Sequence, residues 1–164
     1  MDERFKIYVE QLRDGHVEKL AETFEPAILE VQDADLSFTE PVEVRGEAYL
    51  ADDMLVMHVD AHTYGNIPCR ICNESVKVKV EFEGFYHAVP LDEVKGGIYN
   101  YHTVLRETLL LEVPPLAECH QGKCPQRKTM QKYFKKENAA GEKEVEDGYR
   151  PFADLDLDFE QKNK

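Results

Sequence analysis

The chain has 164 residues, of which 42% are hydrophobic and 32% charged, and its formal net charge is −13. This length is sufficient for one domain with its own hydrophobic core, and the acidic balance disfavours non-specific binding of nucleic acid by the chain as a whole. No run of about 18 apolar residues occurs, so we expect no membrane-spanning helix.

The N-terminal segment, MDERFKIYVEQL, has acidic residues where a secretory signal peptide needs basic ones, and no apolar run follows it. We therefore expect a cytoplasmic protein whose cysteines stay reduced. Hydrophobic residues alternate over positions 5–9, which predicts a short strand. Between Asp14, a possible helix cap, and Pro26 the hydrophobic spacing is helical, which predicts a helix. The predicted buried face of that helix consists of Val17, Leu20, Ala21 and Phe24.

The next segments predict strands. Residues 42–61 show two alternating runs that flank Asp52 and Asp53, which is typical of a β-hairpin. From Ser75, valine and phenylalanine alternate with lysine and glutamate, so one face is buried and the other hydrated, as in an antiparallel sheet. Gly84 predicts a bulge or a bend in this strand.

The period then changes, and a packed helix is predicted around residues 99–112, with Asn100 as its cap and Pro114-Pro115 as its end. Residues 137–148 contain few apolar side chains and predict a mobile linker. The elements together predict an α+β fold: a single domain with a mostly antiparallel β-sheet, one or two packed helices and a charged, partly mobile C-terminal tail. We divide the chain into an α+β domain, residues 1–136, and an acidic linker with a C-terminal docking segment, residues 137–164.

The four cysteines form two short pairs, CRIC and CHQGKC. A C-x2-C turn, or a C-x4-C loop with a glycine inside, can direct two thiolates at one tetrahedral metal ion. We therefore predict a structural zinc site that ties the sheet to the loop after the helix, although the 46 residues between the pairs exceed the interval in a short zinc ribbon. The predicted ligands are Cys69, Cys72, Cys119 and Cys124.

Two other interpretations of the cysteines stay open. They can be reduced core residues, since free cysteine is among the most buried residue types. They can also be redox-active, but a redox C-x2-C pair needs a helix N-terminus to lower the thiol pKa, whereas CRIC leads into a strand. The histidines are scattered, and the sequence contains no phosphate-binding loop and no nucleophile with a neighbouring His-Asp arrangement. We therefore expect no catalytic site and a protein that is not an enzyme.

Charge is arranged in blocks along the chain. Residues 1–120 carry 10 basic and 24 acidic residues. Residues 121–136 carry six basic residues and no acidic ones, and residues 137–164 carry four basic and nine acidic residues. Lysine and arginine neutralise phosphates and an aromatic ring among them can stack on an unpaired base, so the basic run predicts contact with RNA or the ribosome. It can equally be a solvated face balanced by the acidic tail, or the acidic body can dock on a basic protein. The residues predicted to bind RNA or the ribosome are Lys123, Arg127, Lys128, Lys132, Tyr133, Lys135 and Lys136.

Several segments occur in the order found in one protein family: PVEVRGEAYL, the C-x2-C pair leading into a strand, a helix ending RETLLLEVPPLAECHQGKC, and YRPFADLDLDF. In this order and spacing the chain resembles the YceD family, the large ribosomal RNA subunit accumulation proteins, over roughly residues 4–159. That family tends to have C-x-R-C-L, whereas CRICN has Arg70 one place early and Asn73 in place of leucine. The other matching positions are Glu107, Leu110, Leu111, Pro114, Cys119, Cys124, Pro151, Phe152, Ala153 and Leu155.

The resemblance implies a non-enzymatic ribosome-biogenesis factor that supports 23S rRNA accumulation and assembly of the large ribosomal subunit. It implies ribosomal RNA or a large-subunit ribosomal protein as the partner, and no small-molecule substrate or membrane. The alternative is an acidic protein-interaction adaptor with a structural zinc site and no direct contact with RNA.

Overall fold

A computed structural model of the protein describes residues 2–131. The chain divides into two units, Met1–Gln131 and Lys132–Lys164, and the following concerns the first unit. The predicted linker at 137–148 and the C-terminal docking segment lie outside the described residues. Over residues 2–131, no helix combines the length and the apolar character needed to cross a membrane.

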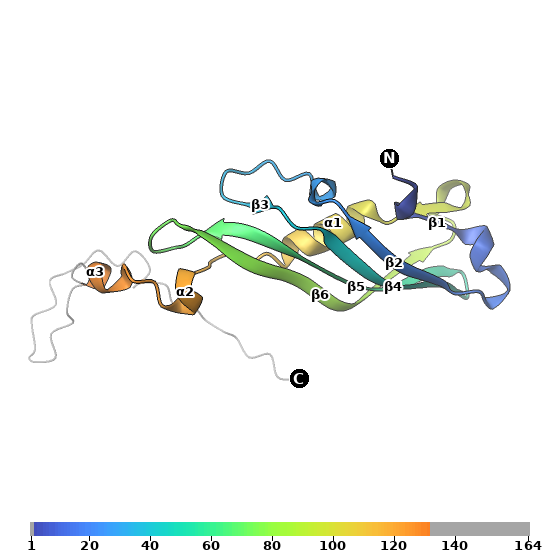
Figure 1. Ribbon diagram of the computed structural model, residues 1–164. Helices are drawn as coiled ribbons and strands as arrows, with labels where there is room; N and C mark the ends of the chain where they lie inside the picture. The colour runs from blue at the N-terminus through green and yellow to red at the C-terminus, as the bar shows by residue number, and fades with distance from the viewer. Residues whose placement is uncertain (1, 132–164) are drawn as a thin grey trace, which may run out of the picture. The chain divides into compact units, whose positions relative to one another are not determined.

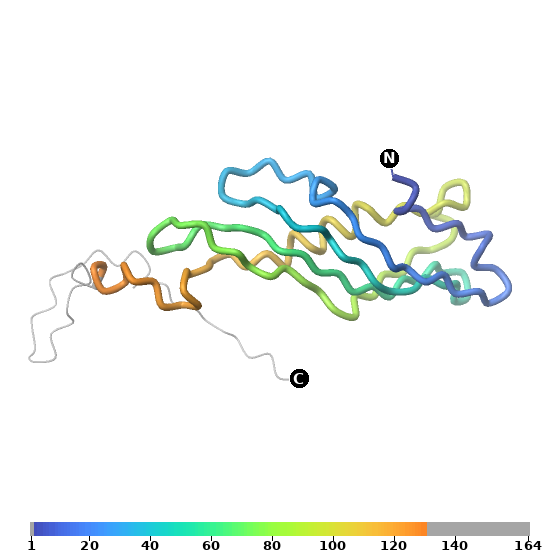
Figure 2. Tube along the Cα trace, in the orientation of Figure 1, coloured from blue at the N-terminus to red at the C-terminus, as the bar shows by residue number. Residues whose placement is uncertain are grey.

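The first unit has the α+β fold that the sequence predicts, with a five-stranded antiparallel sheet, a separate two-stranded sheet and short helices (Figures 1 and 2). The 3-10 helices are labelled η. In chain order the elements are η1 Glu3–Phe5, β1 Lys6–Tyr8, η2 Val9–Gly15, β2 Glu18–Phe24, η3 Pro26–Leu29, β3 Ser37–Phe38, β4 Val42–Ala51, β5 Met54–Pro68, β6 Ser75–Pro90, η4 Lys95–Gly97, β7 Ile98–Asn100, α1 His102–Leu111, α2 Cys119–Gly122 and α3 Arg127–Gln131.

Strand β5 organises the large sheet. On one side it pairs with β4 over residues 54–62 and then with β3 at residues 65–66, and on the other side it pairs with β6 along its whole length. Strand β2 joins the sheet through β4, while β1 and β7 form the two-stranded sheet. Because β5 is 15 residues long and β4 only 10, the β5–β6 hairpin extends beyond β4. The turn that contains Cys69 and Cys72 lies at this extended end.

The core joins the N-terminal segment, the sheet and α1. Phe5 stacks on Phe24 with a centroid distance of 4.1 Å, and Tyr101 packs edge-on against Phe5 at 5.5 Å. The Tyr101 hydroxyl donates a hydrogen bond to the Arg4 carbonyl at 3.1 Å, so this buried polar atom is satisfied. Burial raises the pKa of Tyr101 well above its usual range, so it stays a neutral donor.

Three sequence predictions are confirmed in this region. The hairpin forms as predicted, with Asp52 in its turn at a φ of 51°. Gly84 has a φ of 63° at a break in the β5–β6 register opposite Asp60, and its N–H donates to the Asp60 carboxylate at 2.6 Å. The predicted helix is α1, and the Asn100 side chain accepts a hydrogen bond from the His102 N–H at its start. Tyr99 and Asn100, at the start of the predicted range, lie in β7 instead.

The predicted helix between Asp14 and Pro26 is wrong, because residues 18–24 form strand β2 and pair with β4. The error has a physical reason. Leu20 and Phe24 are four residues apart, a spacing that places two side chains on one face of a helix and also on one face of a strand. Val17 and Ala21, which only the helix would bury, are exposed.

Substitution of Phe24 tests this packing. Phe24→Ala should lower the free energy of unfolding by about 3–5 kcal/mol, since it leaves a cavity beneath the Phe5 ring. Val17→Ala should cost less than about 0.5 kcal/mol, because surface substitutions rarely exceed that value. Urea unfolding measures both. Equal losses of unfolding free energy at the two positions would contradict the strand and support the predicted helix.

Candidate metal centre

The first cysteine pair lies in the tight turn between β5 and β6. The Cys69 N–H donates to the Glu74 carbonyl at 2.8 Å, and the Asn73 N–H donates to the Cys69 carbonyl at 2.9 Å. Asn73 has a φ of 61°, a left-handed conformation that asparagine tolerates better than most residues. The turn therefore folds Cys72 back toward Cys69.

Backbone N–H groups surround the Cys69 sulfur. Its Sγ accepts hydrogen bonds from the Ile71 N–H and the Cys119 N–H, each at 3.4 Å. Burial opposes ionisation of this thiol, but the N–H groups of Cys119, Cys72 and Ile71 outweigh it and lower the pKa of Cys69 to about 6. These contacts stabilise the thiolate, which is the form that binds metal ions.

The second pair reaches the first through the segment after α1. The Arg70 N–H donates to the Ala117 carbonyl at 3.0 Å, and Cys69 and Ala117 form a parallel bridge. The chain then turns through three left-handed residues, His120, Gln121 and Gly122, with φ values of 54°, 53° and 84°. This turn brings Cys124 back to the cluster. Left-handed non-glycine residues cost about 1–2 kcal/mol each, so other interactions must hold the loop in this shape.

All four predicted ligand residues meet at one point, as the sequence predicts. Their sulfur atoms lie within 4.8 Å of one another, and the Sγ atoms of Cys72 and Cys119 are 3.7 Å apart. Four sulfurs around a tetrahedral zinc ion, at about 2.3 Å each, would be about 3.8 Å apart. Cys72 is half-buried, the other three cysteines are buried, and all four are free thiols. The cluster therefore has the spacing of a closed metal site.

In the absence of a cation, the crowding of the thiols keeps Cys119 protonated. Burial, followed by the neighbouring Cys124 and Cys72 side chains, raises the pKa of Cys119 well above its usual range. Several thiolates cannot share so small and buried a volume without a cation. A divalent ion would supply that charge, and sulfur-only donor sets suit zinc and iron–sulfur chemistry.

Glu118 connects the two halves of the cluster. Its side chain is only 8% exposed and accepts hydrogen bonds from the Cys124 N–H and from Arg127 Nε, both at 3.0 Å. Arg70 lies on its other side, with Nη2 at 3.5 Å. The Arg127 side chain, followed by the Cys124 N–H, lowers the pKa of Glu118 to about 2. Sequence reasoning missed Glu118, and the signal available was an acidic residue next to Cys119 with an arginine near each cysteine pair.

The predicted RNA-binding residues differ in their surroundings. The Arg127 guanidinium pairs with the Glu118 carboxylate, so its charge is neutralised within the unit. Lys123 and Lys128 are exposed and pair with no acid within residues 2–131. Lys132, Tyr133, Lys135 and Lys136 lie outside the described residues. His120 is exposed, and the described metal cluster contains only cysteines.

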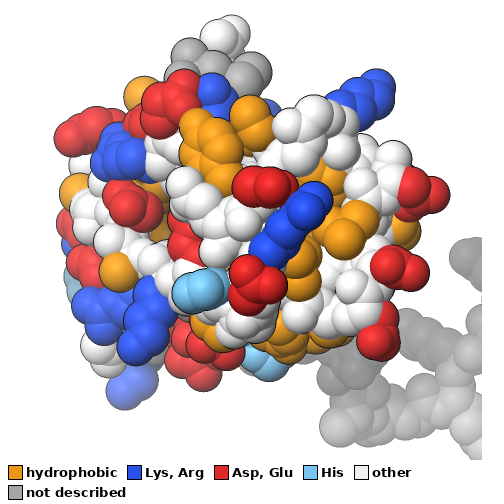
Figure 3. Space-filling view, turned by 90° about the vertical axis from the view of Figure 1, so that its right-hand side faces the viewer, with side chains coloured by type: hydrophobic (Ala, Val, Ile, Leu, Met, Phe, Trp, Pro, Cys, Tyr) orange, Lys and Arg blue, Asp and Glu red, His pale blue; other side chains and the backbone are white. Residues whose placement is uncertain are grey.

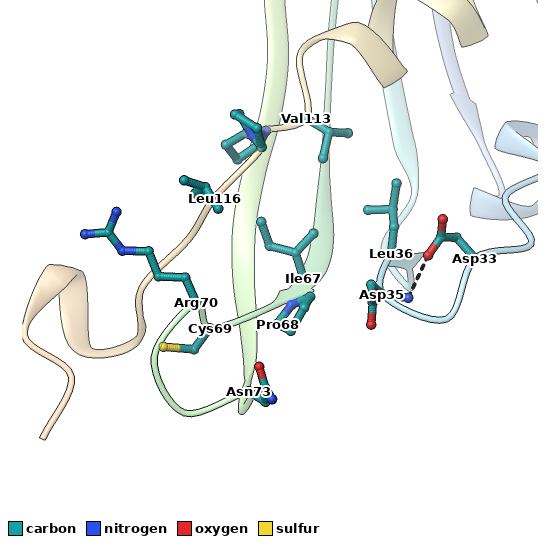
Figure 4. Close-up of a pocket in the computed structure, with 12 residues that line it drawn as sticks. Asp33, Asp35, Leu36, Ile67, Pro68, Cys69, Arg70, Asn73, Val113 and Leu116 are labelled. Carbon is teal, nitrogen blue, oxygen red and sulfur yellow. Dashed lines mark hydrogen bonds between the residues drawn. The ribbon is translucent and has the colours of Figure 1, made fainter. Parts of the chain in front are cut away.

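A groove of about 410 Å³ lies beside the cysteine turn (Figure 4). The loop that carries Asp33 and Asp35 forms one wall, and the Asp35 N–H donates to the Asp33 carboxylate at 2.7 Å. Leu116 and Arg70 lie on the opposite side, and Ile67 lies between the two walls. The groove thus combines apolar surface with two carboxylates.

The face seen in Figure 3 belongs to the other end of the unit, away from the cysteines. Acidic and basic side chains are interspersed on it, with hydrophobic side chains between them. This face therefore shows no large patch of a single charge sign.

Comparisons with known proteins leave the chain without an assigned family. No family model matches it, no curated protein matches it, and no solved structure matches it.

The Glu118 contacts predict a pH dependence. A carboxylate whose pKa falls from 4.5 to about 2 on folding stabilises the protein above the unfolded-state pKa, and this stabilisation is lost as the pH falls through the folded-state value. Wild-type protein should therefore be more stable than Glu118→Gln near neutral pH, and the difference should shrink between about pH 4.5 and about pH 2. Urea unfolding at a series of pH values measures it. A difference that stays constant over this range would contradict the ionised Glu118–Arg127 contact.

Proposed function

We propose that the four-cysteine cluster binds one structural Zn²⁺ and that the protein is a non-enzymatic ribosome-biogenesis factor. In this function it binds ribosomal RNA or a large-subunit ribosomal protein and so supports 23S rRNA accumulation and large-subunit assembly. The observation that carries the metal part is the meeting of four sulfur atoms within 4.8 Å. The ribosomal part draws on the resemblance to the YceD family and on the basic run that follows the cluster.

Zinc is the ion that best fits this donor set. Four cysteines at tetrahedral spacing leave no open coordination position, which is typical of structural rather than catalytic zinc. The N–H groups that point at the Cys69 sulfur support the thiolate form. Structural zinc contributes on the order of 10 kcal/mol, more than enough to offset the left-handed turn at His120 and Gln121.

The zinc proposal predicts a fixed stoichiometry. Reduced protein purified without chelator should contain about one zinc per chain, measured by elemental analysis. Cys124→Ser should remove most of the metal and destabilise the unit, because the turn from Cys119 to Cys124 loses what holds it. His120→Ser changes an exposed residue in the same loop and should retain the zinc. A wild-type metal content below about 0.1 equivalent, with the fold intact, would leave the cysteines as core or redox residues.

The cluster also positions the start of the basic run. Glu118 accepts hydrogen bonds from the Cys124 N–H and from Arg127 and also contacts Arg70, so it joins the beginning of the run to the β5–β6 turn. Lys123 and Lys128 extend from this fixed point as exposed charges on a chain of net charge −13. A few lysines held in defined positions can form charge contacts with phosphates that the rest of the acidic surface would repel. This arrangement supports a ribosomal contact at the basic run.

The acidic adaptor is the second candidate, and the groove in Figure 4 favours it. Asp33 and Asp35 are exposed beside apolar surface that includes Leu116. Such a surface complements a protein segment with basic and bulky apolar residues, and complementary charge selects among partners. Ribosomal proteins with basic extensions have this chemistry.

Charge reversal separates the two candidates. Lys123→Glu/Lys128→Glu should weaken binding of large-subunit components at least about tenfold and reduce the salt dependence of binding, because two phosphate contacts are lost. Lys19→Glu/Lys95→Glu introduces the same change in net charge at two other exposed positions and should have little effect. Binding of purified large-subunit RNA and protein fractions at several salt concentrations measures both variants.

The competing outcome is equally specific. Partners that survive nuclease treatment, bind the Lys123/Lys128 variant normally and are lost with Asp33→Lys/Asp35→Lys would support the adaptor. If neither pair of substitutions affects the binding of large-subunit components, the ribosomal proposal is wrong at both surfaces.

A further inference from the structure

Strand β6 forms an open edge of the large sheet. Within the described residues it pairs only with β5, and the other side of this 16-residue strand faces no further strand (Figure 1). The opposite edge is different, because Arg4 Nη1 donates to the Thr23 carbonyl of β2 at 2.9 Å. An open edge presents unpaired backbone groups that can template another strand.

The backbone groups that point out of this edge can be identified. The Cys69 N–H bonds to the Glu74 carbonyl, and hydrogen-bonded and non-hydrogen-bonded pairs alternate along an antiparallel ladder. The register pairs Ile67 with Val76 and continues in steps to Ala61 and Phe82. It follows that the N–H and C=O groups of residues 76, 78, 80 and 82 form hydrogen bonds with β5. The odd-numbered residues 77, 79 and 81 therefore direct their N–H and C=O groups to the open edge, and Glu83 follows them at the register break beside Gly84.

Those odd-numbered residues carry an ordered pattern of charge. They are Lys77, Lys79, Glu81 and Glu83, and all four side chains are exposed on the hydrated face of the sheet. When the segment is read in the reverse direction about Val80, each lysine position is occupied by a glutamate and each glutamate position by a lysine. The segment is therefore complementary to an antiparallel copy of itself.

We propose that a second copy of this chain pairs with β6, strand against strand, about a two-fold axis at Val80. In this register Lys79 lies opposite Glu81 of the second copy, and Lys77 lies opposite Glu83. The Lys79–Glu81 pair is a hydrogen-bonded pair, as the outward-pointing backbone groups of both residues require. On the other face Val78 lies opposite Phe82. Every directly opposed pair in the segment is thus favourable.

Neighbouring registers are unfavourable, which makes the assignment specific. A two-residue slip in one direction places Lys79 opposite its own copy, and a slip in the other direction does the same for Glu81. A parallel arrangement in register would oppose like charges at every charged position. A one-residue slip would bring the charged face of one strand against the apolar face of the other.

The existing contact of Lys79 fits the proposal. Lys79 pairs with Glu81 of its own strand, so two copies would produce a ring of four alternating charges. Lys77 instead pairs with Glu40 and lies 4.3 Å from the Tyr64 ring centroid, on the β5 side, so in the dimer its side chain would turn to the open edge to meet Glu83. The bulge at Gly84 ends the straight part of the edge, and it leaves residues 76–83 as the segment that can pair. The proposal does not depend on the ribosomal partner.

The test uses two single charge reversals in the full-length chain. Lys79→Glu and Glu81→Lys each convert two opposed pairs into like-charge pairs, so each should raise the dimer dissociation constant at least about tenfold. Mixed one to one, the two variants should form a heterodimer, because the two glutamates of one variant then lie opposite the two lysines of the other. Lys79→Glu/Glu81→Lys on one chain should dimerise like wild type. Analytical ultracentrifugation over a range of concentrations measures all four samples.

A backbone variant gives an independent test. Glu81→Pro removes an N–H that points to the open edge and none that bonds to β5, so it should block dimerisation while β5–β6 pairing persists. Lys19→Glu on β2 is the matched surface control and should leave the dimer unchanged. Circular dichroism confirms that each variant is folded. A wild-type chain that stays monomeric at its solubility limit, or a dimer insensitive to both Glu81→Pro and the single reversals, would overturn the proposal.

Discussion

Four sulfur atoms within 4.8 Å of one another determine where the chain runs after α1. The sheet provides half of this cluster, because β5 and β6 extend past β4 and place Cys69 and Cys72 at the end of a projecting hairpin. The other half has no regular structure of its own apart from a short left-handed turn. Its position depends on the bridge between Cys69 and Ala117, on the hydrogen bond from the Arg70 N–H to the Ala117 carbonyl and on the contact between Arg70 and Glu118. A bound cation would convert a set of mutually unfavourable thiolates into the strongest constraint in the unit.

Glu118 determines which basic side chains of the run are paired internally and which are exposed. A nearly buried carboxylate needs partners, and it finds them in the Cys124 N–H and in arginines on both sides. Arg127 therefore belongs to the internal structure of the loop, and the exposed charge of the described run comes from Lys123 and Lys128. Net charge alone would not reveal this division, since it counts a paired arginine and a free lysine equally.

The sequence predicts those features whose signal is local. The alternation from Ser75, the Asp52-Asp53 turn and the Gly84 bulge all depend on neighbours in the chain, and each is present. The prediction of a helix at Glu18–Phe24 is wrong because the spacing of Leu20 and Phe24 fits both a helix and a strand. Only the pairing with β4 decides between the two. Cysteine spacing indicates that the two pairs converge. It gives no indication of Glu118, whose contact with Arg70 spans 48 residues and exists only after the fold has formed.

The cysteine turn and the open edge of β6 are linked through strand register. The hydrogen bond between the Cys69 N–H and the Glu74 carbonyl is the first rung of the β5–β6 ladder, and it sets which residues of β6 face β5. A shift of one residue at this turn would move Val80 and Phe82 to the hydrated face and the lysines to the core. The register that buries Val80 is therefore the one that displays lysine and glutamate along the edge in self-complementary order. An ion that fixes the turn would stabilise that register, since the cysteine cluster and the edge strand depend on the same short turn.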